Sequence, residues 1–168
     1  KAACGEAAQG EVVEPANFNS PTQIVIAGHN TALARACDIA KAKGAKRALM
    51  LPVSAPFHSS LLQPASVRLA EYMSKLDFSA PQIPLINNVD VAILSNPEEI
   101  KDALVRQVAS SVRWVETIEK MAGMGITHVV ECGPGKVLAG LSKRIDSSLT
   151  GDAIVDQASL DKVLETLK

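Results

Sequence analysis

The chain has 168 residues, of which 47% are hydrophobic and 21% are charged, and its formal net charge is −1. This length and composition allow a sizeable buried core, so we expect a folded globular protein and not a disordered one. No basic cluster is present and no apolar run approaches the roughly 20 residues of a membrane-spanning helix, so neither nucleic acid nor a membrane is an expected partner.

The cysteines are few and far apart. Cys4, Cys37 and Cys132 form no C-x-x-C pair, and no secretory signal begins at Lys1. This pattern predicts neither a disulfide framework nor a zinc site, and it is typical of a protein in the reducing cytoplasm.

The first third of the chain predicts an incomplete α+β unit. Its order, α-β-β-α-β, matches the split βαβ, ferredoxin-like plan without the first strand. Because that strand is central, its loss would leave unpaired backbone groups inside a sheet, so we expect the chain to begin within a domain and to be a C-terminal portion. The expected elements are a helix over 1–8, strands over 12–18 and 23–27, a helix over 32–43 and a strand over 46–53.

The remainder of the chain alternates between strand and helix patterns. Asn96, Pro97 and two glutamates combine an N-cap with a favourable first turn, which predicts a helix to about Val108. The alternation of strands, turns and helices predicts an α/β fold with a parallel sheet flanked by helices. The other expected elements are a helix from Ser59, a buried strand over 84–88, a helix over 114–121, a strand over 127–131, a helix over 136–145, a strand near Ala153 and a helix from Ser159.

His58 is the principal candidate for chemistry. It follows the apolar run 46–53 and two prolines, Pro52 and Pro56, which would place it at the carboxyl end of a strand. Ligands bind at that edge of open α/β sheets, so His58 is a candidate general base. The alternative is a histidine that is hydrogen-bonded in a strand–helix corner, and spacing alone does not decide between the two.

Other patterns predict structure more strongly than function. The run 133–137 is not a phosphate-binding loop, because Val130 and Val137 replace the glycine and the Ser/Thr that this motif requires. Its glycines favour a tight turn into a helix, with anion binding as the weaker alternative. His29 and His128 lack partners at metal-ligand spacing and are interpreted as a loop and a strand histidine.

A nucleophile is harder to find than a base. No G-x-S-x-G elbow occurs in the 168 residues, and Asn30 stands where Gly28-His29 would require a serine. Cys132 could pair with His58 as a thiol nucleophile, although a buried small residue that closes a strand is the commoner role.

Several segments together resemble one enzyme family. The runs VVEPANFNSP (12–21), PVSAPFHSSLL (52–62), NNVD (87–90) and ECGPGKVLAGL (131–141) are similar to segments of malonyl-CoA:acyl carrier protein transacylases of bacterial fatty acid synthesis. The resemblance implies a transferase that moves malonyl from coenzyme A to the phosphopantetheine thiol of acyl carrier protein by a ping-pong Ser-His mechanism, with no cofactor beyond these substrates. It also implies an incomplete ferredoxin-like subdomain over 1–54 and the C-terminal part of an α/β-hydrolase-like domain over 55–168.

The resemblance assigns roles residue by residue. His58 matches the general base, and the backbone carbonyl of Gln107 matches the acceptor that orients it. Phe57 matches the aromatic residue before the base in malonyl-specific members, and Asn19 matches an asparagine of the substrate pocket. The family's serine, its malonyl-binding arginine and a glutamine near the oxyanion hole have no counterparts here and lie upstream of Lys1 in the family's order.

These assignments imply a further partner and leave two alternatives. The missing upstream part of the same enzyme is an expected partner, and residues 1–168 alone are expected neither to fold stably nor to accept malonyl. One alternative is a non-catalytic protein that binds the carrier protein. The other is a hydrolase that uses Cys132 and His58.

Overall fold

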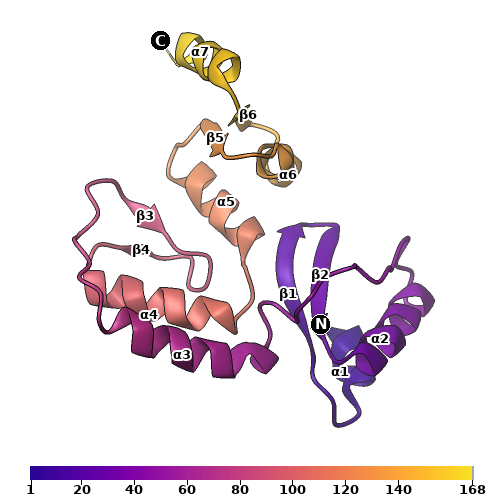
Figure 1. Ribbon diagram of the computed structural model, residues 1–168. Coiled ribbons are helices and arrows are strands. Elements are labelled where there is room, and N and C mark those ends of the chain that lie inside the picture. The colour runs from indigo at the N-terminus through magenta and orange to yellow at the C-terminus, as the bar shows by residue number, and fades with distance from the viewer. Residues whose placement is uncertain (168) are drawn as a thin grey trace. The chain divides into compact units, whose positions relative to one another are not determined.

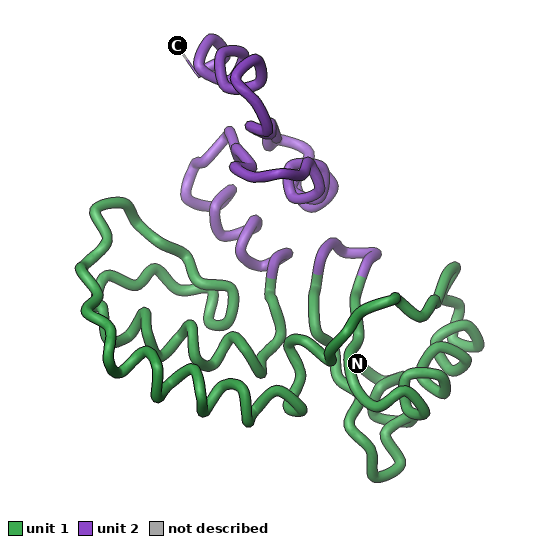
Figure 2. The backbone as a smooth tube through the Cα atoms, in the orientation of Figure 1, with its two compact units in different colours: residues 1–18, 24–113 green, residues 19–23, 114–168 purple. Residues whose placement is uncertain are grey.

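The computed structural model describes residues 1–167. Two compact units are present, one formed by Lys1–Phe18 and Ile24–Arg113 and the other by Asn19–Gln23 and Trp114–Lys168 (Figure 2). Helices and strands are mixed along the chain, and the three sheets found within residues 1–167 have two strands each. The two units are described separately below.

The first unit opens with two helices and a hairpin. α1 (Ala2–Ala8) precedes the strands β1 (Val13–Ser20) and β2 (Gln23–Gly28), which pair in one sheet, and α2 (Asn30–Ala42) follows them and packs against α1 (Figure 1). All four elements were predicted, with shifts of one or two residues at their ends. The core that joins them is made of small side chains, which lets the two helices approach closely. Its buried members are Cys4, Ala7, Val13, Ala32 and Ala36.

The predicted strand over 46–53 is wrong. The structure has irregular chain there, and the large apolar side chains of Leu49, Met50, Leu51 and Val53 are each more than half exposed. A strand requires a partner that accepts and donates ladder hydrogen bonds, and no strand within residues 1–167 pairs with this run. Its composition favours a strand, but the backbone of Val53 instead donates locally to the carbonyl of Leu51, at 2.9 Å.

The first unit continues with a pair of packed helices and a small hairpin. η1 (Ser60–Leu62) leads into α3 (Gln63–Met73), which packs along α4 (Pro97–Val108) (Figure 1). β3 (Leu85–Ile86) pairs antiparallel with β4 (Ile93–Leu94), which was not predicted. Leu85 is 44% exposed, so the prediction of a buried strand is wrong there. The predicted N-cap is confirmed, because the Asn96 side chain accepts from the Glu98 amide.

The segment after α4 returns to the first hairpin. Val112 forms a parallel bridge with Asn17, in which the Val112 amide donates to Ala16 at 2.8 Å and the Phe18 amide donates to Val112 at 3.0 Å. The Ser111 hydroxyl donates to the carbonyl of Pro15 at 2.6 Å. The chain that follows α4 is therefore held against β1.

The second unit confirms the predicted parallel sheet flanked by helices. β5 (His128–Cys132) and β6 (Thr150–Ile154) pair in parallel, from His128 opposite Thr150 to Cys132 opposite Ile154. α6 (Val137–Ile145) crosses between these strands, and α7 (Gln157–Thr166) follows β6 and packs against it, while α5 (Trp114–Gly123) packs on α6 (Figure 1). No helix in residues 1–167 has the length and apolar character needed to cross a membrane.

Candidate functional site

The loop that carries His58 has an unusual backbone. Prolines at 52 and 56 exclude helix before it, and His58 itself has φ of 61°, in the left-handed region that non-glycine residues rarely adopt. Ser59 is fully buried, and its hydroxyl donates to the carbonyl of Pro56 at 2.7 Å. A strained conformation persists only when its surroundings fix it, and such residues concentrate at functional sites.

The ring of His58 is fixed by the main chain of α4. Its Nδ1 lies 3.1 Å from the carbonyl oxygen of Gln107, which is the contact that the family resemblance implied. A carbonyl only accepts, so Nδ1 carries the proton and the neutral ring presents Nε2 as the acceptor nitrogen. The half-buried His58 therefore has the tautomer that a general base requires at Nε2.

The end of α4 makes the Gln107 carbonyl available. Gln107 lies in the last turn of the helix, where carbonyls have no intrahelical partner, and the Ser110 amide also approaches this carbonyl, at 3.4 Å. The Gln107 carbonyl is therefore available to accept a hydrogen bond from the His58 ring.

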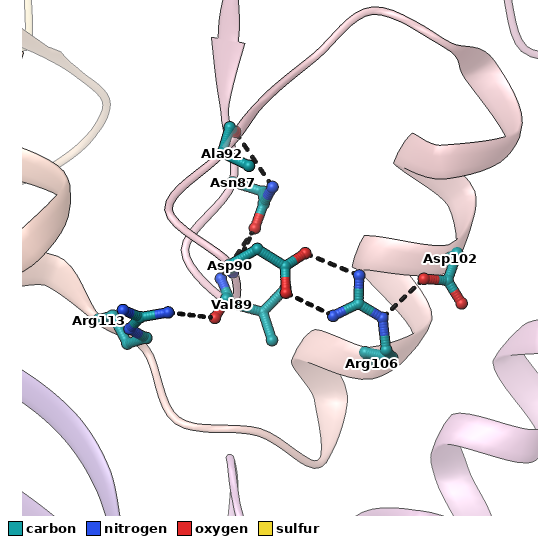
Figure 3. A network of polar contacts seen from close by, with 7 residues as sticks. All are labelled: Asn87, Val89, Asp90, Ala92, Asp102, Arg106 and Arg113. Carbon is teal, nitrogen blue, oxygen red and sulfur yellow. Dashed lines mark hydrogen bonds and ion pairs between the residues drawn. The ribbon is translucent and has the colours of Figure 1, made fainter. Parts of the chain in front are cut away.

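A network of polar contacts holds Arg106, in the last turn of α4 (Figure 3). Both carboxylate oxygens of Asp90 accept from the Arg106 guanidinium at 2.7 Å, and Asp102 accepts from Arg106 Nε at 2.6 Å. Hydrogen bonds from Arg106 hold the pKa of Asp90 below its usual value, and Asp90 and Asp102 raise the pKa of Arg106. Sequence reasoning missed this network, although Asp90 belongs to one of the family-like segments.

The loop that carries Asp90 is itself anchored. The Asn87 side chain accepts from the amides of Val89 and Asp90 and donates to the carbonyl of Ala92, all shown in Figure 3. Arg113 donates to the carbonyl of Val89 at 3.3 Å. Because both Arg106 and Arg113 reach this loop, it links the end of α4 to the segment that returns to β1.

The two residues expected to contact substrate lie at different places in the chain. Phe57 is 51% exposed, next to His58 in the same turn. Asn19 lies in β1 beside the hairpin turn and belongs to the second unit. Their roles in binding substrate stay predictions.

The structure also shows where Cys132, the alternative nucleophile, and the two other histidines lie. Cys132 ends β5 and is exposed, so the prediction of a buried residue there is wrong, and its pairing with His58 stays a prediction. His29 Nδ1 accepts from the Val12 amide at 3.0 Å beside α2, as a loop histidine would. His128 is an exposed strand residue, as expected.

The turn before α6 does not present a free helix N-terminus. The Glu131 carboxylate accepts from the Ala139 amide at 2.9 Å, so the chain supplies its own anion in the first turn. This contact supports the structural interpretation of the glycine-rich turn. Among residues 1–167 no group of three or more His, Cys, Asp or Glu side chains could hold a metal ion.

Comparisons with known proteins agree on one family. No family model matches the chain. The malonyl CoA-acyl carrier protein transacylase of Escherichia coli strain K12 is 52% identical over 163 residues, which cover 97% of this chain and 53% of that protein. The chain therefore spans about half the length of the curated relatives it matches.

Solved structures give the same result. The acyl-carrier-protein S-malonyltransferase of Burkholderia pseudomallei is 60% identical, with a TM-score of 0.95 over 98% of this chain and 53% of that one. A malonyl-transacylase solved in complex with its type II polyketide acyl carrier protein is 50% identical, with a TM-score of 0.96 and the same coverage.

Proposed function

The chain belongs to the malonyl CoA-acyl carrier protein transacylase family, and from this premise we propose that it supplies the base of a malonyl transfer from coenzyme A to acyl carrier protein. The observation that carries the proposal is the hydrogen bond between His58 Nδ1 and the Gln107 carbonyl, because it leaves Nε2 as the basic nitrogen. His58 is the catalytic residue of the proposal, and Gln107 orients it through its main chain.

The nucleophile lies outside these 168 residues in this proposal. No G-x-S-x-G elbow occurs in the sequence, and the chain spans only 53% of its E. coli relative, which leaves room for one elsewhere in a complete protein. The expected partners are accordingly the remaining part of the enzyme, malonyl-CoA and acyl carrier protein. We place the boundary between a ferredoxin-like subdomain and the α/β-hydrolase-like part at residues 54 and 55, and the complete protein in the cytoplasm.

The chemistry has two half-reactions. In the first, the serine hydroxyl gives its proton to His58 Nε2 while its oxygen attacks the malonyl thioester, and the C–S bond then breaks as His58 returns the proton to the departing coenzyme A thiolate. In the second, the phosphopantetheine thiol gives its proton to His58 and attacks the malonyl ester. The C–O bond breaks, and the proton returns to the serine oxygen.

Phe57 and Asn19 each have a proposed role in binding substrate, which the family resemblance supports. Phe57 would limit the size of substituents on the malonyl α-carbon, and Asn19 would line the pocket. Because the acyl group enters as an activated thioester whose thiolate is a good leaving group, we propose that a carbonyl that only orients the imidazole is sufficient, whereas a hydrolase of unactivated bonds profits more from a buried carboxylate. We assign the transfer to fatty acid synthesis.

The test is acylation of a complete protein that contains this sequence. The protein is incubated with malonyl-CoA, its intact mass and the modified peptide are determined, and holo acyl carrier protein is then added. The proposal expects malonyl on a serine outside residues 1–168, followed by transfer to the carrier thiol. Labelling of Cys132, with loss of the label in a Cys132→Ala variant, would establish the thiol alternative instead, and carrier binding without any acylation would establish the non-catalytic one.

A further inference from the structure

Glu14, a residue of β1, reaches the loop of the proposed base. Its Oε2 accepts from the Ser60 amide at 2.8 Å, and its Oε1 accepts from the Ser60 hydroxyl at 2.9 Å. Both carboxylate oxygens thus bind one residue that stands 46 positions later in the chain. Ser60 is the first residue of η1 and comes two residues after His58.

We propose that Glu14 is a positioning residue for His58, an inference that rests on the function proposed above. Its carboxylate holds the first residue of η1 and thereby fixes the backbone on which the imidazole is carried. It contacts neither the ring nor, in this proposal, the substrate.

The start of η1 lacks any other cap. Ser59 occupies the N-cap position, but its side chain makes no capping hydrogen bond, because its hydroxyl is committed to the carbonyl of Pro56. The first amides of a helix have no intrahelical acceptor and favour a negative charge. Glu14 supplies both the acceptor and the charge from a strand distant in sequence.

β1, the strand that contains Glu14, also contacts the segment that follows α4. β1 pairs with β2 on one edge and bridges Val112 on the other, beyond the end of α4. The ring of His58 is therefore held by the Gln107 carbonyl, and the chain two residues after His58 is held by Glu14. Glu14 is a residue of β1 itself, and Gln107 lies five residues before Val112, which bridges β1.

The left-handed backbone of His58 makes this restraint necessary. A non-glycine residue at φ of 61° relaxes toward the common regions unless the residues on both sides are fixed. Pro56 and the buried Ser59 fix the chain before and immediately after the turn, and Ser60 is the next position. Without the Glu14 carboxylate, that position would lose two hydrogen bonds at once.

Kinetics of a complete transacylase with this sequence test the inference through Glu14→Ala and Glu14→Gln. A misplacement of about 1 Å at a catalytic group can cost on the order of 100-fold, so Glu14→Ala should lower kcat by about 10- to 100-fold with a smaller change in KM. Glu14→Gln keeps one acceptor oxygen and should lie between this variant and wild type. Glu71→Gln, on the exposed side of α3, is the matched control and should leave kcat unchanged.

A second-site experiment separates positioning from general stabilisation. If Glu14 acts through His58, Glu14→Ala should cause no further loss of transfer in a His58→Ala background, whereas a general loss of folded protein would lower both backgrounds equally. Equal fold-losses in the two backgrounds would overturn the inference. So would an unchanged kcat in Glu14→Ala.

Nuclear magnetic resonance of the His58 ring gives a readout that does not need activity. Wild type should show a single tautomer with the proton on Nδ1, and Glu14→Ala should show a mixture of tautomers or exchange broadening, while Glu71→Gln remains like wild type. An unchanged His58 signal in Glu14→Ala would refute the positioning role. If wild type transfers no malonyl, the proposed function fails, and this spectrum still decides the role of Glu14.

Discussion

Replacement of His58 by glycine should separate stability from activity. The left-handed backbone at φ of 61° costs a non-glycine residue about 1–2 kcal/mol, and glycine avoids this cost. Glycine loses about 0.5–1 kcal/mol through the greater freedom of its unfolded chain. The hydrogen bond to Gln107, worth about 1 kcal/mol, is also lost. These terms nearly cancel, so the free energy of unfolding should fall by less than about 1 kcal/mol.

His58→Ala is the matched control for this prediction. Alanine loses the same hydrogen bond but keeps the unfavourable backbone, so it should be less stable than His58→Gly by about 0.5–1 kcal/mol. Both variants lack the base and should lose malonyl transfer by about 10²- to 10⁴-fold. Urea unfolding and steady-state transfer by a complete protein measure the two quantities. A glycine variant that is less stable than the alanine variant would contradict the backbone cost assigned to position 58, and one that keeps wild-type activity would contradict the role of His58 as the base.

Three further predictions concern the surroundings of the base. Gln107→Ala keeps the main-chain carbonyl and should retain most of the transfer activity, so a loss as large as that of His58→Ala would contradict the orientation by backbone. Phe57→Ser should raise kcat/KM for methylmalonyl relative to malonyl, because one methyl is worth about 1–3 kcal/mol of discrimination in an apolar pocket. An unchanged ratio would show that Phe57 does not select the substrate. Hydrogen bonds from Arg106 lower the pKa of Asp90, and this exposed ion pair stabilises the folded protein by about 1 kcal/mol or less. The stabilisation is complete above the unfolded pKa of Asp90, near 3.8, and is lost as the pH falls through its lower folded pKa. Urea unfolding of wild type and Asp90→Asn should therefore differ at about pH 6 and converge toward about pH 3, and a difference that persists in acid would contradict this assignment.

Local patterns predicted most of the helices and the parallel pair. Asn96 and Pro97 cap and start α4 with groups that lie within one turn, and the glycine-rich turn between β5 and α6 acts within a few residues. Such interactions join residues that are close in sequence, so they can be predicted from the sequence alone. The parallel pairing followed from the strand–helix–strand order alone.

The failed strand and the missed contacts share one cause. The run 46–53 has the composition of a strand, but strand formation depends on a partner that local sequence does not specify. Glu14 and Ser60 are 46 residues apart, and Asp90 and Arg106 are 16 apart, so neither pair forms a motif. The contact of His58 with Gln107 spans 49 residues and was expected only because the family resemblance supplied it.

We propose that His58 acts as a base whose neutral Nε2 accepts the proton in malonyl transfer. Adding imidazole to the His58→Gly variant of a complete protein tests it directly, because removal of the side chain leaves space that a free base can occupy. We expect the rate of malonyl transfer by this variant to rise with the concentration of neutral imidazole, toward the wild-type rate. A folded variant that binds malonyl-CoA but shows no response to imidazole, or that transfers malonyl at the wild-type rate without it, would contradict the account.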